Sequence, residues 1–184
     1  LDEKHAKGLA THILVGLVQT QILLYKKSGE DIAPFTNLQG KLGNSEYSVL
    51  QPLVCNIQNC SRNGDDLEMA NITETLTDGT IQALSSVIRV YLGSQQVLSV
   101  VDGQHRREGF RIVLEWLEKV VADGEYPLTG IFKPTDTTQK GRKISFEILQ
   151  FWDDVLNLAF AHTHIKVEVH LGLDQGEERQ LFND

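Results

Sequence analysis

A short apolar run that leads through a glycine into an amphipathic pattern constrains the fold of this chain more than any other stretch. Residues 97–101 read VLSVV, and this content of β-branched residues predicts a buried strand. Asp102 and Gly103 interrupt the run. Apolar residues then recur at helical spacing at Phe110, Val113, Leu114, Leu117, Val120 and Val121. The predicted order is therefore strand, tight turn, helix.

The first turn of this predicted helix is polar and basic. A helix N-terminus presents unpaired N–H groups and the positive end of the helix dipole, which favour phosphate. Gly103 lets a ligand approach the backbone closely. Asp102 can cap the helix, hold one of its neighbours, or help to bind a metal. The side chains available to a ligand are those of Gln104, His105, Arg106 and Arg107.

Two plainer interpretations of the same turn are open. Arg107 and Arg111 can simply be solvated, with Arg111 paired to Glu115 four residues on. Asp102 and His105 are candidate catalytic residues for acid–base chemistry. Because no nucleophile is visible, we favour Asp102 as a cap and His105 as a hydrogen-bond donor to a ligand or the backbone.

A second basic cluster occurs in a predicted polar loop. Lys140, Arg142 and Lys143 would usually be solvated, but near the first turn of the helix they would extend a phosphate-contacting surface. We predict no metal site, because the histidines and cysteines lack zinc-ligand spacing. Cys55 and Cys60 are expected to be free thiols, and Trp116 and Trp152 to pack in the core.

Length and composition indicate one globular domain over residues 1–184. Of the residues, 41% are hydrophobic and 23% are charged, as in ordinary soluble proteins. The net charge of −8 excludes a broadly basic nucleic-acid surface but allows a local basic patch. We expect no membrane span and no signal peptide, hence a cytoplasmic protein. The chain starts with Leu and stops within a predicted helix, as a fragment of a longer chain would.

Periodicity elsewhere predicts a mixture of helices and strands. A helix over 81–92, capped by Thr77 or Asp78, is expected to pack beside the strand at 97–101 and so favours the α/β class. Pro52 suggests an edge position or a bend. The remaining predicted elements are helices over 9–24, 144–161 and 176–184, strands within 47–58 and over 165–171, and loops over 30–44 and 59–66.

Residues 102–106, DGQHR, are identical to the motif that defines the DGQHR-domain family, which includes the DndB proteins of bacterial DNA phosphorothioation (sulfur modification) systems. A later stretch, HIKVEVHLGLDQGEERQLFND at 164–184, is similar to the second conserved block of that family. The two blocks cover about a third of the chain and occur in the family's order. The resemblance implies an α/β, ParB-like DGQHR domain, with a mixed sheet flanked by helices and the motif at the start of the helix near Gln104.

The turn also resembles, more distantly, the Gly-x-x-Arg box of the ParB and sulfiredoxin superfamily, which cradles a nucleotide phosphate or a DNA-linked cofactor. Sulfiredoxin chemistry needs a cysteine inside this turn. Residues 103–106 read GQHR and contain none. We therefore exclude that activity, since no other side chain here replaces a thiolate nucleophile.

The resemblance implies a cytoplasmic bacterial DNA-binding regulator of transcription linked to DNA phosphorothioation. Its partners would be double-stranded DNA and other DNA-modification proteins, in a monomer or an oligomer. Gly103, Gln104 and His105 would shape the contact. DNA phosphates would be held by Arg106, Arg107, Arg111, Lys140, Arg142 and Lys143.

An enzymatic alternative uses the same turn. A nucleotide with Mg²⁺, the metal held by Asp102, would make the chain an NTPase, or a nuclease, of a modification-linked defence system. We favour the regulator, which requires no cofactor. A third possibility is a partner-binding module of a modification complex.

Overall fold

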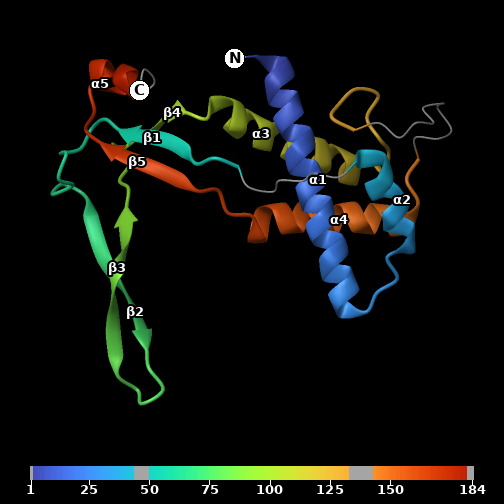
Figure 1. Ribbon diagram of the computed structural model, residues 1–184, viewed down its shortest axis with the longest axis horizontal. Coiled ribbons are helices and arrows are strands. Elements are labelled where there is room, and N and C mark those ends of the chain that lie inside the picture. The colour runs from blue at the N-terminus through green and yellow to red at the C-terminus, as the bar shows by residue number, and fades with distance from the viewer. Residues whose placement is uncertain (1, 44–49, 133–142, 182–184) are drawn as a thin grey trace. The chain divides into compact units, whose positions relative to one another are not determined.

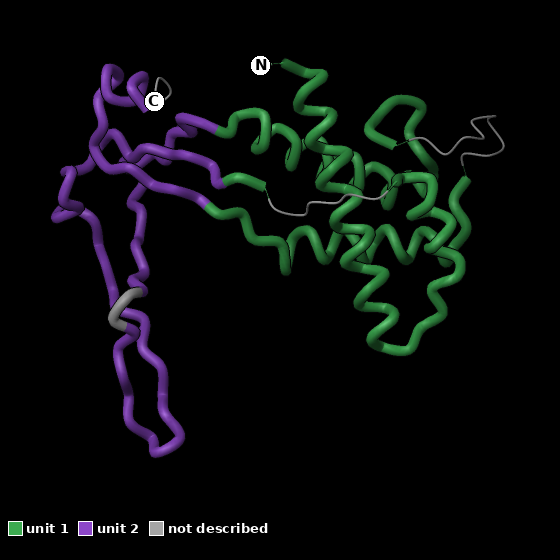
Figure 2. The backbone as a smooth tube through the Cα atoms, viewed as in Figure 1, with its two compact units in different colours: residues 1–51, 103–166 green, residues 52–102, 167–184 purple. Residues whose placement is uncertain are grey.

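The computed structural model describes residues 2–43, 50–132 and 143–181 (Figure 1). The chain forms two compact units, each built from two segments (Figure 2). We call residues 1–51 and 103–166 the helical unit, and residues 52–102 and 167–184 the strand unit. Helices and sheets are both present, so the predicted α/β class is confirmed. The single DGQHR domain over the whole chain stays a prediction.

The described residues of the helical unit contain four helices: α1 (Glu3–Ser28), α2 (Ala33–Leu42), α3 (Gln104–Asp123) and α4 (Phe146–His162). Buried residues of α1, α3 and α4 form its core. Trp116 and Trp152 lie in this core, as predicted, with ring centroids 5.1 Å apart. The indole N–H of Trp152 donates to the Tyr126 hydroxyl over 3.1 Å. This bond satisfies a polar group that would otherwise be costly to bury.

Helix α1 was predicted from its apolar stripe, and its ends follow local rules. The Asp2 carboxylate caps its start, and Gly29 ends it in the left-handed conformation with φ 82°. By length and composition α1 could cross a membrane, so the expectation that no segment could do so is wrong. In this structure the fully buried residues Ala6, Ala10, Leu14 and Val18 line one side of α1 within the helical core.

The loop predicted over 30–44 contains helix α2, so that prediction is wrong. Pro34 lies in the first turn of α2, where its missing N–H costs no hydrogen bond. Phe35 and Leu38, three residues apart, are buried, and the Phe35 ring stacks on Phe151 with centroids 4.5 Å apart. This packing outweighs the low helix propensity of Asn37 and Gly40.

In its described residues, the strand unit contains a three-stranded mixed sheet. Strand β1 (Leu53–Ile57) lies between β4 (Leu98–Asp102), which is antiparallel to it, and β5 (Val167–Leu171), which is parallel. The mixed sheet is thus confirmed. Pro52 precedes the central strand, so the suggested edge position is wrong. Strand β4 was expected to be buried, but it is an edge strand and its residues are only partly buried.

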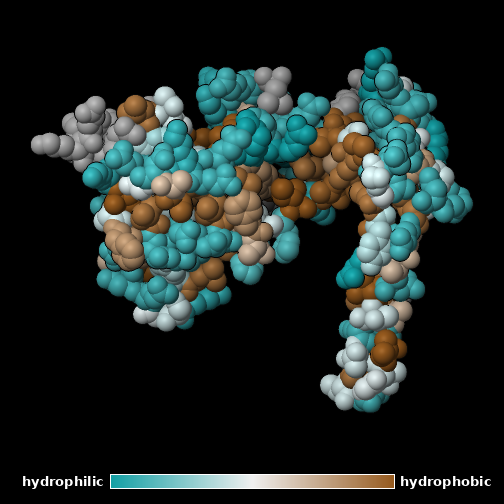
Figure 3. Space-filling model, turned by 180° about the vertical axis from the view of Figure 1, so that it is seen from behind, coloured by the Kyte–Doolittle hydropathy of each residue, from teal (hydrophilic) through white to brown (hydrophobic). Residues whose placement is uncertain are grey.

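The helix predicted over 81–92 is wrong, because these residues form β3 (Ile81–Tyr91), paired in a hairpin with β2 (Glu68–Thr75). The β-branched residues of this stretch favour a strand. Asp78 is a turn residue instead of a helix cap: its carboxylate accepts from the N–H of Thr80 over 2.9 Å, and Gly79 has φ 83°. The hairpin leaves apolar side chains exposed on its surface, including Ile81, Ile88 and Val90 (Figure 3).

Helices α1 and α3 approach each other closely at Gly109. A Cβ atom on this residue would lie 3.2 Å from the Cβ of Leu9 and 3.3 Å from the backbone nitrogen of Ala10. We therefore expect Gly109→Val to lower the free energy of unfolding by about 1–3 kcal/mol through overpacking. Urea denaturation followed by circular dichroism measures this change.

Gly16, on α1, is the matched control, because a Cβ there would meet no atom within 4 Å. Gly16→Ala should raise stability by up to about 1 kcal/mol through helix propensity. A Gly109→Val protein as stable as the wild type would show that the two helices do not need this close approach.

Candidate functional site

The start of α3 is a glycine turn without a side-chain cap. Gly103 is the N-cap residue of α3; it is buried in the left-handed conformation, with φ 90° and ψ 17°, and has no side chain with which to bond the N–H groups of the first turn. Asp102 is the last residue of β4, so the prediction of Asp102 as the N-cap residue is wrong. A residue with a Cβ would be strained at this φ. The glycine therefore makes the turn that precedes α3.

His105, in the first turn of α3, contacts the start of α1. The backbone N–H of Asp2 donates to Nε2 of His105 over 3.0 Å. The ring of His5 lies edge-on to that of His105, with centroids 5.0 Å apart. His105 was expected to donate to a ligand or the backbone; towards this backbone group it accepts. This N–H occupies the Nε2 lone pair, which disfavours His105 as a general base at that nitrogen.

The first turn of α1 adds groups that the sequence did not point to. Lys4 and His5 are exposed there, and they line a shallow depression of about 390 Å³ with Asp2, Gly8 and Leu9. Asp2 and His105 are separated by 103 residues in the chain. No local pattern could have found this contact.

Arg111, by contrast, is already paired. Its guanidinium bonds Glu108, with Nε 2.9 Å from Oε2, and it also bonds Glu115, so the predicted pairing four residues on is confirmed. The Arg111 hydrogen bonds hold the pKa of the Glu108 carboxyl below its ordinary value. One guanidinium paired with two carboxylates has a net negative charge, so this group of side chains disfavours a phosphate. Arg107, one turn earlier, is exposed.

The second basic cluster lies mostly outside the described residues. Lys140 and Arg142 belong to that part. Lys143 is exposed, and its backbone forms an isolated β-bridge with Glu125. Lys143 thus lies beside the C-terminal end of α3, and not beside the first turn of that helix.

The other reactive side chains form no site in the described part of the chain. No group of three or more His, Cys, Asp or Glu there could hold a metal ion. His170 bonds Glu168 over 3.0 Å. Cys55 and Cys60 are free thiols, and burial raises the pKa of the Cys55 thiol.

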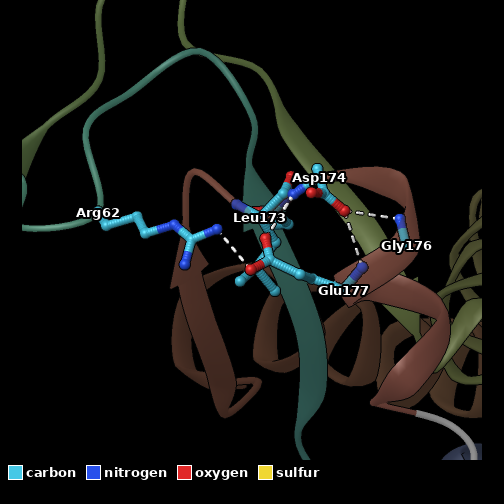
Figure 4. A network of polar contacts seen from close by, with 6 residues as sticks. Arg62, Leu173, Asp174, Gly176 and Glu177 are labelled. Atoms are coloured by element: carbon cyan, nitrogen blue, oxygen red, sulfur yellow. Dashed lines mark hydrogen bonds and ion pairs between the residues drawn. The ribbon is translucent and has the colours of Figure 1, made fainter.

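The second block forms a well-capped short helix in the strand unit, α5 (Gln175–Gln180). The Asp174 carboxylate accepts from the N–H of Gly176 over 2.7 Å and of Glu177 over 2.9 Å, and Glu177 accepts in return from the N–H of Asp174 (Figure 4). Arg62 pairs with Glu177. The acidic residues at this helix start therefore have a structural role, as capping and the helix dipole predict.

Asn56, in the central strand β1, joins this strand to the second block, and its role was not predicted from the sequence. Its fully buried side chain accepts from the N–H of Leu173 over 3.2 Å and donates to the carbonyl of Leu173 over 2.9 Å. It also donates to Glu178 over 2.6 Å. The available signal was a single amide inside the apolar run LVCNI. Buried polar groups of this kind are almost always hydrogen-bonded.

Replacing Asn56 should loosen this junction. Asn56→Ala removes the side chain that bonds the partly buried backbone groups of Leu173, and we expect a loss of about 1–3 kcal/mol in the free energy of unfolding. Gln58→Ala is the control, since Gln58 is exposed and, among the described residues, its side chain bonds Glu178 alone, over 2.9 Å. Urea denaturation should show a clearly larger loss for Asn56→Ala. Equal losses would contradict the role assigned to Asn56.

The same contacts predict a pH dependence. Hydrogen bonds from Gln58 and then Asn56 lower the pKa of the Glu178 carboxyl. A carboxyl with a lowered pKa stabilises the fold above its unfolded pKa, and this contribution is lost as the pH falls through the folded value. The free energy of unfolding should therefore fall on acidification below the ordinary range of glutamate, and less steeply in Glu178→Gln. Parallel curves for the two proteins would contradict this assignment.

Comparison with known proteins identifies no relative of this chain. No known protein family, curated protein or solved structure matches this chain. The likeness to the DGQHR-domain family thus depends on the two sequence blocks alone, one at the start of α3 and one spanning β5 and α5.

Proposed function

We propose that this chain is a DNA-binding regulator of transcription, linked to DNA phosphorothioate modification, and that the start of α3 contacts DNA phosphates. The observation that carries the proposal is the helix start behind Gly103. Its N-cap residue is a glycine, which has no side chain to act as a cap, and its first turn bears His105, Arg106 and Arg107. The identity of residues 102–106 with the DGQHR motif supplies the link to DNA modification.

The other helix starts are closed by their own residues. Asp2 caps α1, Ser145 caps α4 and Asp174 caps α5, each through a side-chain oxygen. At α2, the Asp31 carboxylate accepts from the N–H of Ala33 over 2.9 Å. An anion would have to displace these oxygens. At α3 a phosphate could itself bond the first N–H groups and lie at the positive end of the dipole.

The charges around the start of α3 favour an anion, although the whole chain is acidic. The Asp2 carboxylate bonds the N–H groups of Lys4 and His5, and Glu3 pairs with Lys7 over 2.6 Å. The Lys4 and Arg107 side chains are exposed at the first turns of α1 and α3. A local cationic surface of this kind can attract DNA despite a net charge of −8.

Arg107→Ala should weaken binding to a promoter duplex several-fold. If Arg107 contacts one phosphate, the slope of log K against log salt should shrink by about 1. Fluorescence anisotropy titrations of labelled duplex at several salt concentrations measure both quantities. Phosphorothioate-modified and unmodified duplexes should be compared in the same experiment.

Arg111→Ala is the matched control, since Arg111 lies on the same helix but is held by Glu108 and Glu115. It should change the salt slope little. Equal losses in the two variants would contradict the assignment of Arg107. Magnesium-dependent ATP binding with phosphate release would instead establish the nucleotide-hydrolysing alternative.

A further inference from the structure

The β2–β3 hairpin has no core of its own. Its two strands lie side by side and form a sheet separate from that of β4, β1 and β5 (Figure 1). Large apolar side chains of the hairpin are exposed, with 70% of Ile81, 53% of Ile88 and 44% of Val87 accessible to solvent. A sheet of two strands is only marginally stable in water, and independent stability requires a third strand or a packed helix. A further strand would therefore stabilise the hairpin.

Both strands of the hairpin have an edge without a strand partner. In the described part of the chain, β2 pairs only with β3 and β3 only with β2. The second edge of each strand presents backbone N–H and C=O groups that can pair with a strand of another chain. Natural proteins protect such edges with charged side chains, with proline or with a bulge.

The two edges of the hairpin differ in this protection. Strand β2 has an exposed glutamate near each end, Glu68 and Glu74. Strand β3 has 11 residues, of which Arg89 alone is charged, and it contains no lysine and no proline. The edge of β3 is therefore the one that is better suited to pairing with another strand.

A bulge restricts this pairing to the part of β3 nearest to β4 in the sequence. Residues 84–87 of β3 lie opposite Ile72 alone, so the regular pairing with β2 is interrupted there. A bulge of this kind bends the strand. The segment Ile88–Tyr91 beyond the bulge pairs regularly with β2 and consists mostly of β-branched and aromatic residues, which favour a sheet.

We propose that two copies of this chain associate through β3, with the Ile88–Tyr91 segment of each copy antiparallel to the same segment of the other. The product is a four-stranded sheet in the order β2–β3–β3–β2. This pairing gives each hairpin the further strand that it lacks. The inference goes beyond the proposed function and does not depend on it.

The distribution of charge favours a second copy as the occupant of this edge. Because Arg89 is the one charged residue of β3, it would face its own counterpart only in the register centred on Arg89. Every other two-fold register places an uncharged residue opposite it, which avoids the destabilising contact of like charges.

The same arrangement is closed. It uses the β3 edges of both copies, and the edges that remain outside are those of β2, with Glu68 and Glu74. Closed two-fold dimers are the commonest soluble oligomers. Pairing of β3 with β2 of a second copy would instead leave an unprotected β3 edge at one end, and such head-to-tail contacts produce open assemblies.

Ile88→Lys tests the pairing, with Asn71→Lys as the matched control. Asn71 is exposed and lies opposite Ile88 on the same face of the hairpin, but it belongs to β2. Sedimentation equilibrium should show a wild-type dimer. Ile88→Lys should weaken the dimer about tenfold or more, because both copies lose an apolar side chain and gain a like charge at the pairing edge. Asn71→Lys should leave the dissociation constant unchanged, and circular dichroism verifies that both variants are folded.

Amide hydrogen exchange measures the same pairing without a variant. In the dimer, the outward N–H groups of Ile88–Tyr91 donate to the second copy and should exchange slowly. Dilution below the dissociation constant should speed their exchange. Exchange in this segment that does not change with protein concentration would contradict the pairing.

The other outcomes also decide the proposal. A wild-type chain that stays monomeric overturns it and leaves the β3 edge to a strand of a different protein. Assemblies that grow with concentration overturn the closed arrangement. A dimer that Ile88→Lys leaves intact, or one that Asn71→Lys weakens equally, shows that the copies meet elsewhere than at the β3 edge.

Discussion

The close approach of α1 to α3 is the contact on which the candidate site depends. Gly109 has no Cβ, so the backbone of α1 at Ala10 comes nearer to α3 than a larger residue would permit. Small residues at helix crossings allow such short interaxial distances. One consequence lies at the helix starts, where the N–H of Asp2 reaches the ring of His105. A core packing contact thereby determines the hydrogen-bonding state of a surface histidine.

The spacing of charges along α3 divides its basic residues into two kinds. Arg111 has Glu108 three residues before it and Glu115 four residues after it, and it bonds both. Arg107 has Phe110 and Arg111 at the corresponding forward positions, so its own helix offers no carboxylate one turn on. The difference follows from sequence order alone. It explains why the first turn of the helix can attract an anion while the second turn is neutralised.

Elements defined by their own sequence were predicted well, and those defined by distant contacts were not. The patterns over α1, α3, α4 and β5 are local, and the structure confirms them. Helix α2 depends on burying Phe35 against Phe151, and β3 depends on pairing with β2. The apolar residues of β3 also fit a helical period, so periodicity alone could not distinguish strand from helix there.

The same distinction between local patterns and distant contacts applies to the candidate site. Gly103 and the basic first turn follow from a strand–glycine–helix pattern, which is local. The contribution of Asp2 and His5 depends on the α1–α3 packing, and that of Asn56 depends on where the chain returns at Leu173. None of these contacts leaves a periodic or motif signal.

The two blocks that resemble the DGQHR-domain family each contain a helix start, and the two helix starts differ in their N-cap residues. A helix start has N–H groups that need an acceptor. At α5 the chain supplies the Asp174 carboxylate and, through Glu177, a reciprocal bond, so an incoming anion would meet negative charge. At α3 the N-cap residue is a glycine, which supplies no side-chain oxygen, and the first turn bears cationic side chains. A phosphate of the kind that we propose would supply the acceptor at α3, whereas at α5 the Asp174 carboxylate is that acceptor.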